Sequence, residues 1–383
     1  QLVYSQSPLT TRALPRLSRS VYGSYSGHTV PVESSARITR GFASDNCSGG
    51  HPAMIEAIVR ANEGHANPYG ADPETARFGE LVRVEFGEAA VGFPMLNGTG
   101  ANVAALRAMA RPHQAVICAS TAHIHIDETA APEVIGGLKL LTADTSDGKL
   151  TPELAATRLA DPADVPHAAW PVVVSVAQAT EVGTVYTPDE IRALADFAHE
   201  HGMLLHVDGA RLANAAASQG LTLNEASLGA GADVLSLGAN KNGALFGESV
   251  VFGDPELARG FEVLRKGSLQ LASKMRFVST QLNAQLEGGL WREIAEHSNS
   301  MARLLADGIE WTEGADLAQA VQANIVFASM PIAAARRLVE ACTPNSPLLF
   351  EAGEAGIIRL VCSWDTQPED VDRLLGLLRS AQG

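Results

Sequence analysis

The stretch "TPDEIRALADFAHEHGMLLHVDGAR", residues 187–211, contains the pattern that decides the fold. Thr187, followed by a proline and then Glu190, is typical of a capped helix start, and Gly202 is a typical helix end. The apolar run "MLLHV" that follows predicts a buried strand, and "PVVVSVAQA" at 171–179 predicts another strand before the helix. Strand, helix and strand within about 40 residues predict a parallel βαβ unit.

Alternating helices and strands continue on both sides of this unit. Apolar spacing predicts helices at 51–63, 73–87 and 99–110. It predicts short buried strands at 114–120, 233–238 and 249–253. Right-handed crossovers place the connecting helices on both faces of such a sheet. We therefore expect an α/β domain over residues 41–290, in which helices sandwich a mostly parallel sheet.

Residues 291–383 carry a separate pattern. A long helix is predicted at 291–310. Two strands are predicted after it, at 323–330 and 356–364, and two shorter helices, at 331–342 and 368–381. Because 383 residues are enough for two domains, we expect a smaller C-terminal α/β domain with its own core. Residues 1–40 are rich in Arg, Ser and Thr. That composition fits either a targeting segment or an ordered arm, and both interpretations stay open.

The overall composition is typical of a globular enzyme without membrane spans. Hydrophobic residues make up 46% of the chain and charged residues 19%, and no apolar run is long enough to cross a bilayer. The formal net charge of −15 disfavours nucleic acid and anionic membranes as partners. The 4 cysteines form neither a CxxC motif nor a zinc-ligand pattern, which favours reduced thiols in the cytoplasm. The N-terminal extension leaves organellar targeting open.

Polar residues that could carry chemistry follow several of the predicted strands. His123 follows the strand at 114–120, Asp208 ends "LLHVD", and Lys241 follows "VLSLGAN". Ligands of open parallel sheets bind at the carboxyl ends of the strands. We therefore expect these three side chains at one edge of one sheet, beside the helix that begins in "LNGTGAN" at 96–102.

The glycine-rich stretch and the aspartate each have a structural and a chemical interpretation. Gly98 and Thr99 are typical of a glycine-rich helix cap, but they would also let backbone N–H groups approach an anion. Asp208 could form an ion pair with Arg211. Alternatively, Asp208 could face a protonated ring nitrogen of a cofactor and leave Arg211 to bind a carboxylate.

Lys241 lies at the end of an apolar strand, where an ammonium group must reach water, pair or lose its proton. A neutral lysine forms a Schiff base with an aldehyde. An anion-binding loop, then an aspartate, then a lysine is the order of a pyridoxal phosphate (PLP) site.

Several motifs also occur in an order that resembles one enzyme family. They are "FASDNCSG" (42–49), "YGADPETARFGE" (69–80), "NGTGAN" (97–102), "AHIHIDE" (122–128), "QATEVGTVY" (178–186), "LHVDGARLANA" (205–215), "GANKNGALFGE" (238–248), "LASKMRF" (271–277) and "RLVCSWDT" (359–366). On these motifs, residues 41–383 resemble the low-specificity L-threonine aldolases of the PLP fold type I, or aspartate aminotransferase, superfamily. The resemblance implies a large domain with a mostly parallel, seven-stranded type of sheet and a smaller C-terminal domain. It also implies homodimers or homotetramers with shared active sites.

The resemblance implies roles for individual residues. Lys241 would hold PLP through a Schiff base, Asp208 would pair with the ring nitrogen, and His123 would stack on the ring. The other implied binding residues are Gly98, Thr99 and Arg276 at the phosphate, Ser44, Arg211 and Arg359 at the substrate carboxylate, and Tyr69 lining the pocket across a subunit boundary. Arg211 would contact both the cofactor and the substrate.

The implied reaction is retro-aldol cleavage of L-threonine, L-allo-threonine and related L-3-hydroxy-α-amino acids to glycine and an aldehyde. A phenylserine aldolase, a transaldolase or a β-eliminating lyase remains an alternative, as does a non-catalytic PLP-fold protein. The presence of Lys241, Asp208 and the arginines disfavours the last of these. The sequence determines neither the preferred configuration at Cβ nor the aldehyde.

One position departs from many family members. Glu181 in "QATEVG" stands where others carry a histidine that contacts the β-hydroxyl group. The general base therefore stays open among His123, Glu181, His125 and an ordered water, with His123 preferred. On a strand, His123 and His125 would share a face and could bind a metal near Asp127, but further ligands with convincing spacing are missing and no catalytic metal is expected.

Overall fold

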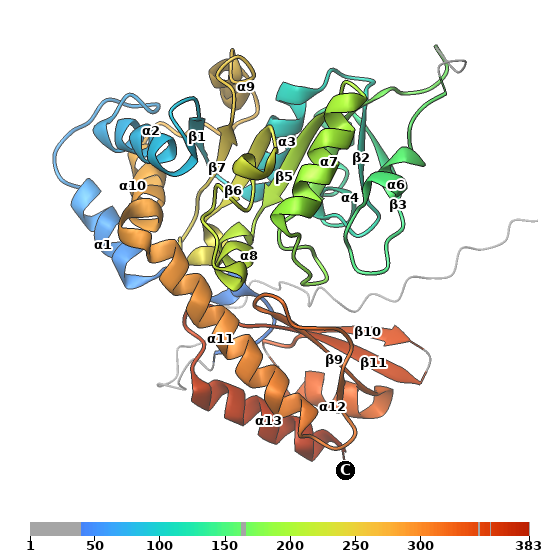
Figure 1. The fold of residues 1–383 in the computed structure, drawn as a ribbon. Helices are drawn as coiled ribbons and strands as arrows, with labels where there is room; N and C mark the ends of the chain where they lie inside the picture. Colours follow the sequence, from blue (N-terminus) through green and yellow to red (C-terminus); the bar gives the residue numbers. More distant parts are fainter. Residues whose placement is uncertain (1–39, 162–165, 344, 353, 383) are drawn as a thin grey trace, which may run out of the picture. The chain divides into compact units, whose positions relative to one another are not determined.

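The computed structural model describes residues 40–383 except 162–165, 344, 353 and 383. Two sheets organise this part of the chain, as Figure 1 shows. The arm predicted for residues 1–40 lies, apart from Arg40, outside the described residues. No helix in the described part of the chain is long and apolar enough to cross a membrane.

The large sheet has seven strands in the spatial order β1-β7-β6-β5-β4-β2-β3. They are β1 (Val91–Met95), β2 (Ala115–Ala119), β3 (Lys139–Ala143), β4 (Pro171–Ala177), β5 (Leu204–Gly209), β6 (Val234–Gly238) and β7 (Glu248–Phe252). β7 runs antiparallel to β1 and β6, and the other neighbouring pairs are parallel. The predicted α/β class with a mostly parallel seven-stranded sheet is therefore confirmed.

Helices connect and cover these strands. They are α1 (Pro52–Ala61), α2 (Pro73–Phe86), α3 (Gly98–Met109), α4 (His123–Ile126), α5 (Ala131–Val134), α6 (Pro152–Ala156), α7 (Pro188–Glu200), α8 (Leu212–Gln219), α9 (Phe261–Gly267) and α10 (Arg276–Leu286). The predicted start of α7 is confirmed, because the Thr187 hydroxyl accepts from Glu190 N at 3.2 Å and Glu190 Oε2 accepts from Thr187 N at 2.8 Å. This reciprocal pair satisfies two N–H groups at the helix start.

Alternation along β5 decides which side of the sheet each helix covers. Leu205 and Val207 are buried in the main core together with Leu194 of α7. Asp208 points to the other face, where Asn102 of α3 donates a hydrogen bond to it. Because successive strand residues face opposite sides, α7 and α3 cover opposite faces of the sheet. The polar face of β5 is therefore the one that meets the start of α3.

The small sheet is antiparallel, with the spatial order β10-β11-β9-β8. Its strands and the helices beside it are β8 (Asp316–Leu317), β9 (Ile325–Pro331), β10 (Leu348–Ala352), β11 (Ala355–Val361), α11 (Leu290–Glu310), α12 (Ile332–Ala341) and α13 (Pro368–Gln382). A separate core includes Val326 and Leu360. α11 contributes Ile294 to the main core and Leu305 to this one. The domain boundary at residue 290 falls at the start of α11 and stays a prediction, since this helix belongs to both cores.

Candidate active site

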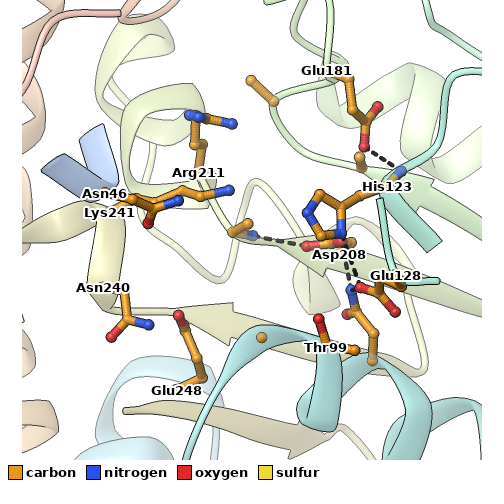
Figure 2. Close-up of a pocket in the computed structure, with 15 residues that line it drawn as sticks. Asn46, Thr99, His123, Glu128, Glu181, Asp208, Arg211, Asn240, Lys241 and Glu248 are labelled. Carbon is orange, nitrogen blue, oxygen red and sulfur yellow. Dashed lines mark hydrogen bonds and ion pairs between the residues drawn. The ribbon is translucent and has the colours of Figure 1, made fainter. Parts of the chain in front are cut away.

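A cavity of about 220 Å³ lies at the carboxyl edge of the large sheet (Figure 2). Its lining comes from distant parts of the chain: Asn46, Gly98, Thr99, Asn102, His123, Glu128, Ala177, Ala179, Glu181, Asp208, Ala210, Arg211, Asn240, Lys241 and Glu248. Asp208 lies near the end of β5, and Lys241 follows β6. Glu248 begins β7, which reaches the same edge because it runs antiparallel. The joint placement of His123, Asp208 and Lys241 that the sequence predicted is therefore found.

Asp208 is held by hydrogen bonds from two neutral donors. Its Oδ1 accepts from Ala210 N at 3.0 Å, and its Oδ2 accepts from Asn102 Nδ2 at 2.7 Å. The same Asn102 nitrogen donates to Glu128 Oε1 at 2.9 Å, and that oxygen lies 2.9 Å from His123 Nδ1. These contacts form a chain from His123 to Asp208, visible in Figure 2, that fixes the orientation of both side chains.

The contact between His123 and Glu128 shifts the pKa of both side chains. Hydrogen bonding to Glu128 raises the pKa of His123, although burial acts in the opposite direction. Burial raises the pKa of Glu128, and hydrogen bonds from His123 and Asn102 reduce that rise. The same contact therefore raises the pKa of His123 and limits the rise in the pKa of Glu128.

Glu181 is a carboxylate directly beside His123. It follows β4, and its Oε1 accepts from the backbone N–H of His123 at 2.8 Å. Burial raises the pKa of Glu181 to about 7, and the negative charge of Asp208 adds to the rise. A carboxylate with such a pKa can exchange a proton near neutral pH.

Lys241 lies in a short turn, Asn240–Asn242, between β6 and β7. Burial lowers the pKa of its amine, and the positive charge of Arg211 lowers that pKa further. A lower pKa increases the fraction of neutral amine, the form that attacks an aldehyde. Gly243 follows with a φ of +91°, a left-handed conformation that favours glycine and turns the chain toward β7.

Glu248 is a second carboxylate with an unusual environment. Its side chain lines the cavity on the side of Asn240, and its Oε2 accepts from Ala239 N at 2.6 Å. Burial raises the pKa of Glu248 to about 7, while the hydrogen bond from Ala239 and the charge of Lys241 act in the opposite direction. The cavity therefore holds two carboxyl groups, Glu181 and Glu248, whose pKa values burial raises to about 7.

The start of α3 forms one end of the cavity. The side chain of Asn97 caps the helix by accepting from Gly100 N at 2.7 Å. A Cβ at Gly98 would meet no other atom within 4 Å, whereas a Cβ at Gly100 would overlap the side-chain amide of Gln270. Gly98 therefore leaves open space at a helix N-terminus, where an anion is favoured. Arg276 does not line the cavity, but its Nε is buried without a hydrogen-bond partner among the described residues.

Arg211 pairs with Asp45, a partner that the sequence did not suggest. Its Nε donates to Asp45 Oδ2 at 2.8 Å and its Nη2 donates to Asp45 Oδ1 at 2.9 Å. Of the two interpretations that the sequence left open, the ion pair between Arg211 and Asp208 is not formed, and neutral donors hold Asp208 instead. Ser44 does not line the cavity, and its Oγ accepts from Asn46 N at 3.2 Å, which caps the short turn Asp45–Cys47.

Arg359 and Tyr69 also lie outside the cavity lining. Arg359 is on β11, and its Nη2 lies 3.5 Å from the carbonyl oxygen of Ala43. Burial lowers the pKa of Arg359, and the positive charge of Arg211 lowers it further, so the two guanidinium groups are close enough to repel. Tyr69 is 51% exposed, with the ammonium of Lys266 at 4.3 Å from its ring centroid.

The metal pair considered from the sequence is not supported. A shared face was considered for the case of a strand, but His123 and His125 lie in α4, a helix. Residues two apart on a helix point about 200° apart, so these rings do not share a face. His123, Glu128 and Asp208 do offer ligand atoms within 4.8 Å of one another. However, these atoms already take part in hydrogen bonds. Asn102 donates to Glu128 and to Asp208, and His123 bonds to Glu128.

Sequence reasoning assigned no role to Asp45, Asn102, Glu128 and Glu248. Each lies inside one of the motifs that resemble the family, such as "FASDNCSG" or "AHIHIDE". Their position in these motifs is the signal by which the sequence could have indicated them. Their partners are distant in sequence: Asn102 bonds to Asp208, and Asp45 bonds to Arg211. Local spacing carries no information about such pairs.

Known proteins resemble this chain over most of its length. A family model described as beta-eliminating lyase matches residues 41–331. The low specificity L-threonine aldolase of Pseudomonas aeruginosa is 41% identical over 346 residues, which cover 90% of this chain and 99% of that protein. A low specificity L-threonine aldolase of Pseudomonas sp. is 41% identical over 340 residues, which cover 88% of this chain and 97% of that protein.

Among solved structures, the threonine aldolase of Leishmania major matches with a TM-score of 0.81 and 29% identity. The match covers 88% of this chain and 98% of that one. Sequence, fold and the arrangement of Lys241 and Asp208 thus agree. The chain belongs to the low-specificity L-threonine aldolase family, within the beta-eliminating lyases.

Proposed function

We propose that the protein cleaves L-threonine, L-allo-threonine and related L-3-hydroxy-α-amino acids to glycine and an aldehyde. The observation that carries this proposal is the presence of Lys241, Asp208 and the open start of α3 around one cavity. The names of the Pseudomonas relatives support the same substrate class.

The residues present fit pyridoxal phosphate. Backbone N–H groups beside Gly98 and Thr99 would bind the phosphate, and Arg276, whose Nε lacks a partner among the described residues, would join them. Lys241 would bond to the aldehyde, and Asp208 would keep the ring nitrogen protonated. When bound, PLP supplies an electron-poor ring that accepts the electron pair released as the bond between Cα and Cβ breaks.

The chain's own residues would orient the substrate. Arg211 and Arg359 would bind its carboxylate, with Ser44 beside them, and this contact would decide which bond at Cα stands perpendicular to the cofactor ring. His123 would cover the ring, held by Glu128 at 2.9 Å. Orientation of this kind selects the bond that breaks.

Removal of the β-hydroxyl proton falls to Glu181 in this proposal. The sequence favoured His123, but the raised pKa of His123 makes it a poorer proton acceptor at neutral pH. Glu181, with a pKa of about 7, has the affinity that suits a general base there. The hydrogen bond from His123 N to Glu181 Oε1, at 2.8 Å, holds this carboxylate at the cavity wall.

Assembly, domain division and location are proposed as well. Tyr69 is 51% exposed and outside its own chain's cavity lining, which supports a position facing the site of a neighbouring subunit in a homodimer or homotetramer. The two separate cores support domains at 41–290 and 291–383. The 4 cysteines are free thiols, which supports a cytoplasmic location.

β-Elimination is a second candidate, because the matching family model is described as beta-eliminating lyase. That reaction would use the same Lys241 and Asp208 but would release different products. From L-threonine, it would give 2-oxobutanoate and ammonia, with no carbon–carbon cleavage.

Product analysis separates the two candidates. The protein loaded with PLP is incubated with L-threonine, and glycine, acetaldehyde and 2-oxobutanoate are measured. We expect glycine and acetaldehyde in equal amounts, lost in Lys241→Ala and retained in the control Lys139→Ala, which changes an exposed lysine on β3. Production of 2-oxobutanoate alone would support elimination, and cleavage of no 3-hydroxy amino acid in a panel would contradict the proposed function.

A further inference from the structure

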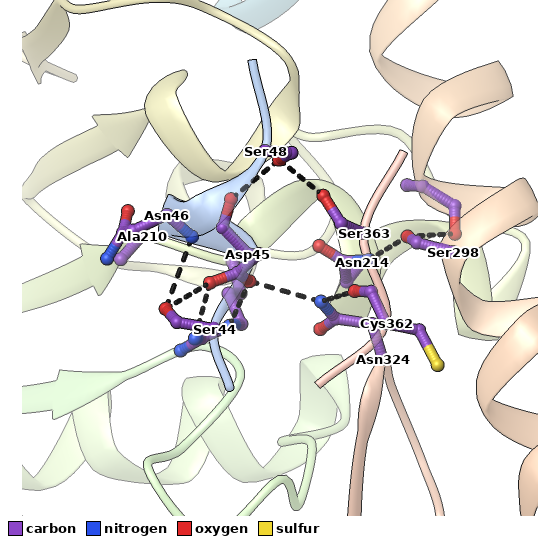
Figure 3. Close-up of polar contacts among 12 residues, drawn as sticks. Ser44, Asp45, Asn46, Ser48, Ala210, Asn214, Ser298, Asn324, Cys362 and Ser363 are labelled. Carbon is purple, nitrogen blue, oxygen red and sulfur yellow. Dashed lines mark hydrogen bonds and ion pairs between the residues drawn. The ribbon is translucent and has the colours of Figure 1, made fainter. Parts of the chain in front are cut away.

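Asp45 is a buried carboxylate that the proposed chemistry does not use. It lies in the short turn Asp45–Cys47 and is 1% exposed. Three nitrogen atoms donate to it: Nε and Nη2 of Arg211 at 2.8 and 2.9 Å, and Nδ2 of Asn324 at 3.1 Å. Figure 3 shows Asp45 with its polar neighbours Ser44, Ser48 and Asn324. A carboxylate this well saturated is fixed in position.

The contacts of Asp45 join the large sheet to the small one. Asn324, one residue before β9, also donates from Nδ2 to the carbonyl oxygen of Cys362 at 2.8 Å. The carbonyl oxygen of Asp45 accepts from Ser48 Oγ at 2.8 Å, and that hydroxyl lies 2.6 Å from Ser363 Oγ. Arg211, which follows β5, is therefore anchored to residues that flank β9 and β11.

Charge around Asp45 explains why it stays ionised. Burial raises its pKa, but the charges of Arg211 and Lys241 and the hydrogen bonds from Arg211 and Asn324 leave the pKa below its usual value. The negative charge also acts on Arg359 and opposes the repulsion that Arg359 receives from Arg211. One carboxylate thus lets two guanidinium groups lie close together.

The geometry of the pair decides which edge of Arg211 is left for a ligand. Nε and Nη2 form a two-point contact with Asp45, which fixes the plane of the guanidinium group. Within the described part of the chain, no hydrogen bond uses Nη1. The side chain of Arg211 is only 10% exposed, so the whole group has little freedom to turn.

We propose that Asp45 is a positioning residue for the substrate carboxylate: by holding the edge of Arg211 formed by Nε and Nη2, it leaves the end formed by Nη1 and the second N–H of Nη2 for the ligand, in one orientation. This inference rests on the proposed function, in which Arg211 and Arg359 bind the carboxylate. Arg211 then contacts the carboxylate in one fixed orientation, and Arg359, whose Nε is buried without a partner in the described residues, supplies a second contact. Recognition of the carboxylate therefore depends on a residue that never touches the substrate.

Asp45→Asn tests this role because it keeps the size of the side chain. The variant loses the charge and one of the two oxygens that hold Arg211, so the guanidinium group can turn. We expect the KM for L-threonine to rise about 10- to 100-fold, the range of one lost hydrogen bond to a charged group, while kcat changes much less. Asn324→Ala, which keeps the two-point pair and removes one donor, should raise KM in the same direction by a smaller factor.

A ligand without a carboxylate separates positioning from general damage. Binding of L-threonine and of 1-amino-2-propanol, the same molecule without its carboxylate, is followed through the absorbance of bound PLP. Asp45→Asn should weaken binding of L-threonine and leave that of 1-amino-2-propanol unchanged. Ser298→Ala, which removes a hydroxyl that accepts from Asn214 at 2.8 Å, is the control for a buried polar change nearby and should alter neither.

Two results would overturn the inference. One is an unchanged KM for L-threonine in folded Asp45→Asn and Asn324→Ala, and the other is an equal loss of binding for both ligands. Failure of the wild-type protein to cleave L-threonine would instead contradict the proposed function. In that case, the comparison of the two ligands still decides the role of Asp45.

Discussion

Nδ1 of His123 lies 2.9 Å from Oε1 of Glu128, a carboxylate whose side chain is fully buried. The contact leaves Nε2 as the ring nitrogen that can face the cavity, and it raises the pKa of the histidine. A histidine held in this way is protonated over a wider range of pH than a free one. The pKa of His123 should therefore depend on the charge of Glu128.

Glu128→Gln should lower the pKa of His123. The glutamine keeps the shape of the side chain but carries no charge, so the hydrogen bond that stabilises the imidazolium form most becomes weaker. Titration of the His123 ring resonance by NMR, assigned with His123→Gln, measures the change. A pKa that stays the same or rises would show that Glu128 does not set it.

Glu181→Gln should remove the limb of the pH profile on which kcat rises as pH increases toward 7. The base must be deprotonated, and burial raises the pKa of Glu181 to about 7, so activity grows up to that pH and then levels off. Loss of a general base lowers kcat by about 10²- to 10⁴-fold. The amide oxygen of glutamine can still accept from His123 N, so the fold is kept. If Glu181→Gln keeps both kcat and its rise with pH, Glu181 is not the general base and His123 becomes the candidate again.

Glu248→Gln should stabilise the protein without bound cofactor more at pH 8 than at pH 5. Burial raises the pKa of Glu248 to about 7, above the unfolded value near 4.5. As pH rises between these values the unfolded state loses its proton first, so the wild-type protein loses stability up to pH 7 and keeps that loss above it. A glutamine does not ionise, so the variant avoids this loss of stability, and its amide oxygen can still accept from Ala239 N.

The measurement for Glu248→Gln is the difference in Tm from the wild type at the two pH values. Glu310→Gln, at an exposed glutamate that ends α11, is the control and should show no such trend. A difference that is flat or falls with pH would contradict the role assigned to burial at Glu248.

Gly98 and Gly100, both at the start of α3, should respond differently to replacement by alanine. Gly100→Ala would displace the amide of Gln270, which accepts from Leu96 N at 3.0 Å, and should destabilise the protein by about 1–3 kcal/mol through overpacking. Gly98→Ala meets open space and should leave the Tm without cofactor unchanged, but the methyl group should weaken PLP binding at the start of α3. Equal Tm losses in both variants, or PLP affinity untouched in Gly98→Ala, would contradict this division.

The sequence predicted most of the fold because its signals are local. The helix start at Thr187 and the apolar strand before Asp208 depend on neighbours within a few residues, and both are found. β1, β3 and α4 were not predicted, because short segments of mixed character have no clear period. A four-residue helix such as His123–Ile126 is too short for a helical period to appear in the sequence.

Part of the site could be predicted because strand ends converge. Asp208, Lys241 and His123 all follow strands, so a parallel sheet brings them to one edge. The partner of Arg211 could not be found in this way, since Asp45 is 166 positions away and comes from a turn outside the sheet. The pKa of Glu181 was likewise out of reach, because it depends on burial and on the charge of Asp208.

Reduction of the PLP-loaded protein with borohydride, followed by digestion and mass spectrometry, tests most directly whether Lys241 holds the cofactor. Reduction makes the bond between a lysine amine and the cofactor aldehyde permanent, so the modified residue can be located. We predict the pyridoxyl group on Lys241 and on no other lysine of the wild-type protein, and no modified peptide from Lys241→Ala. A group attached elsewhere, or none at all, would contradict the account of this site.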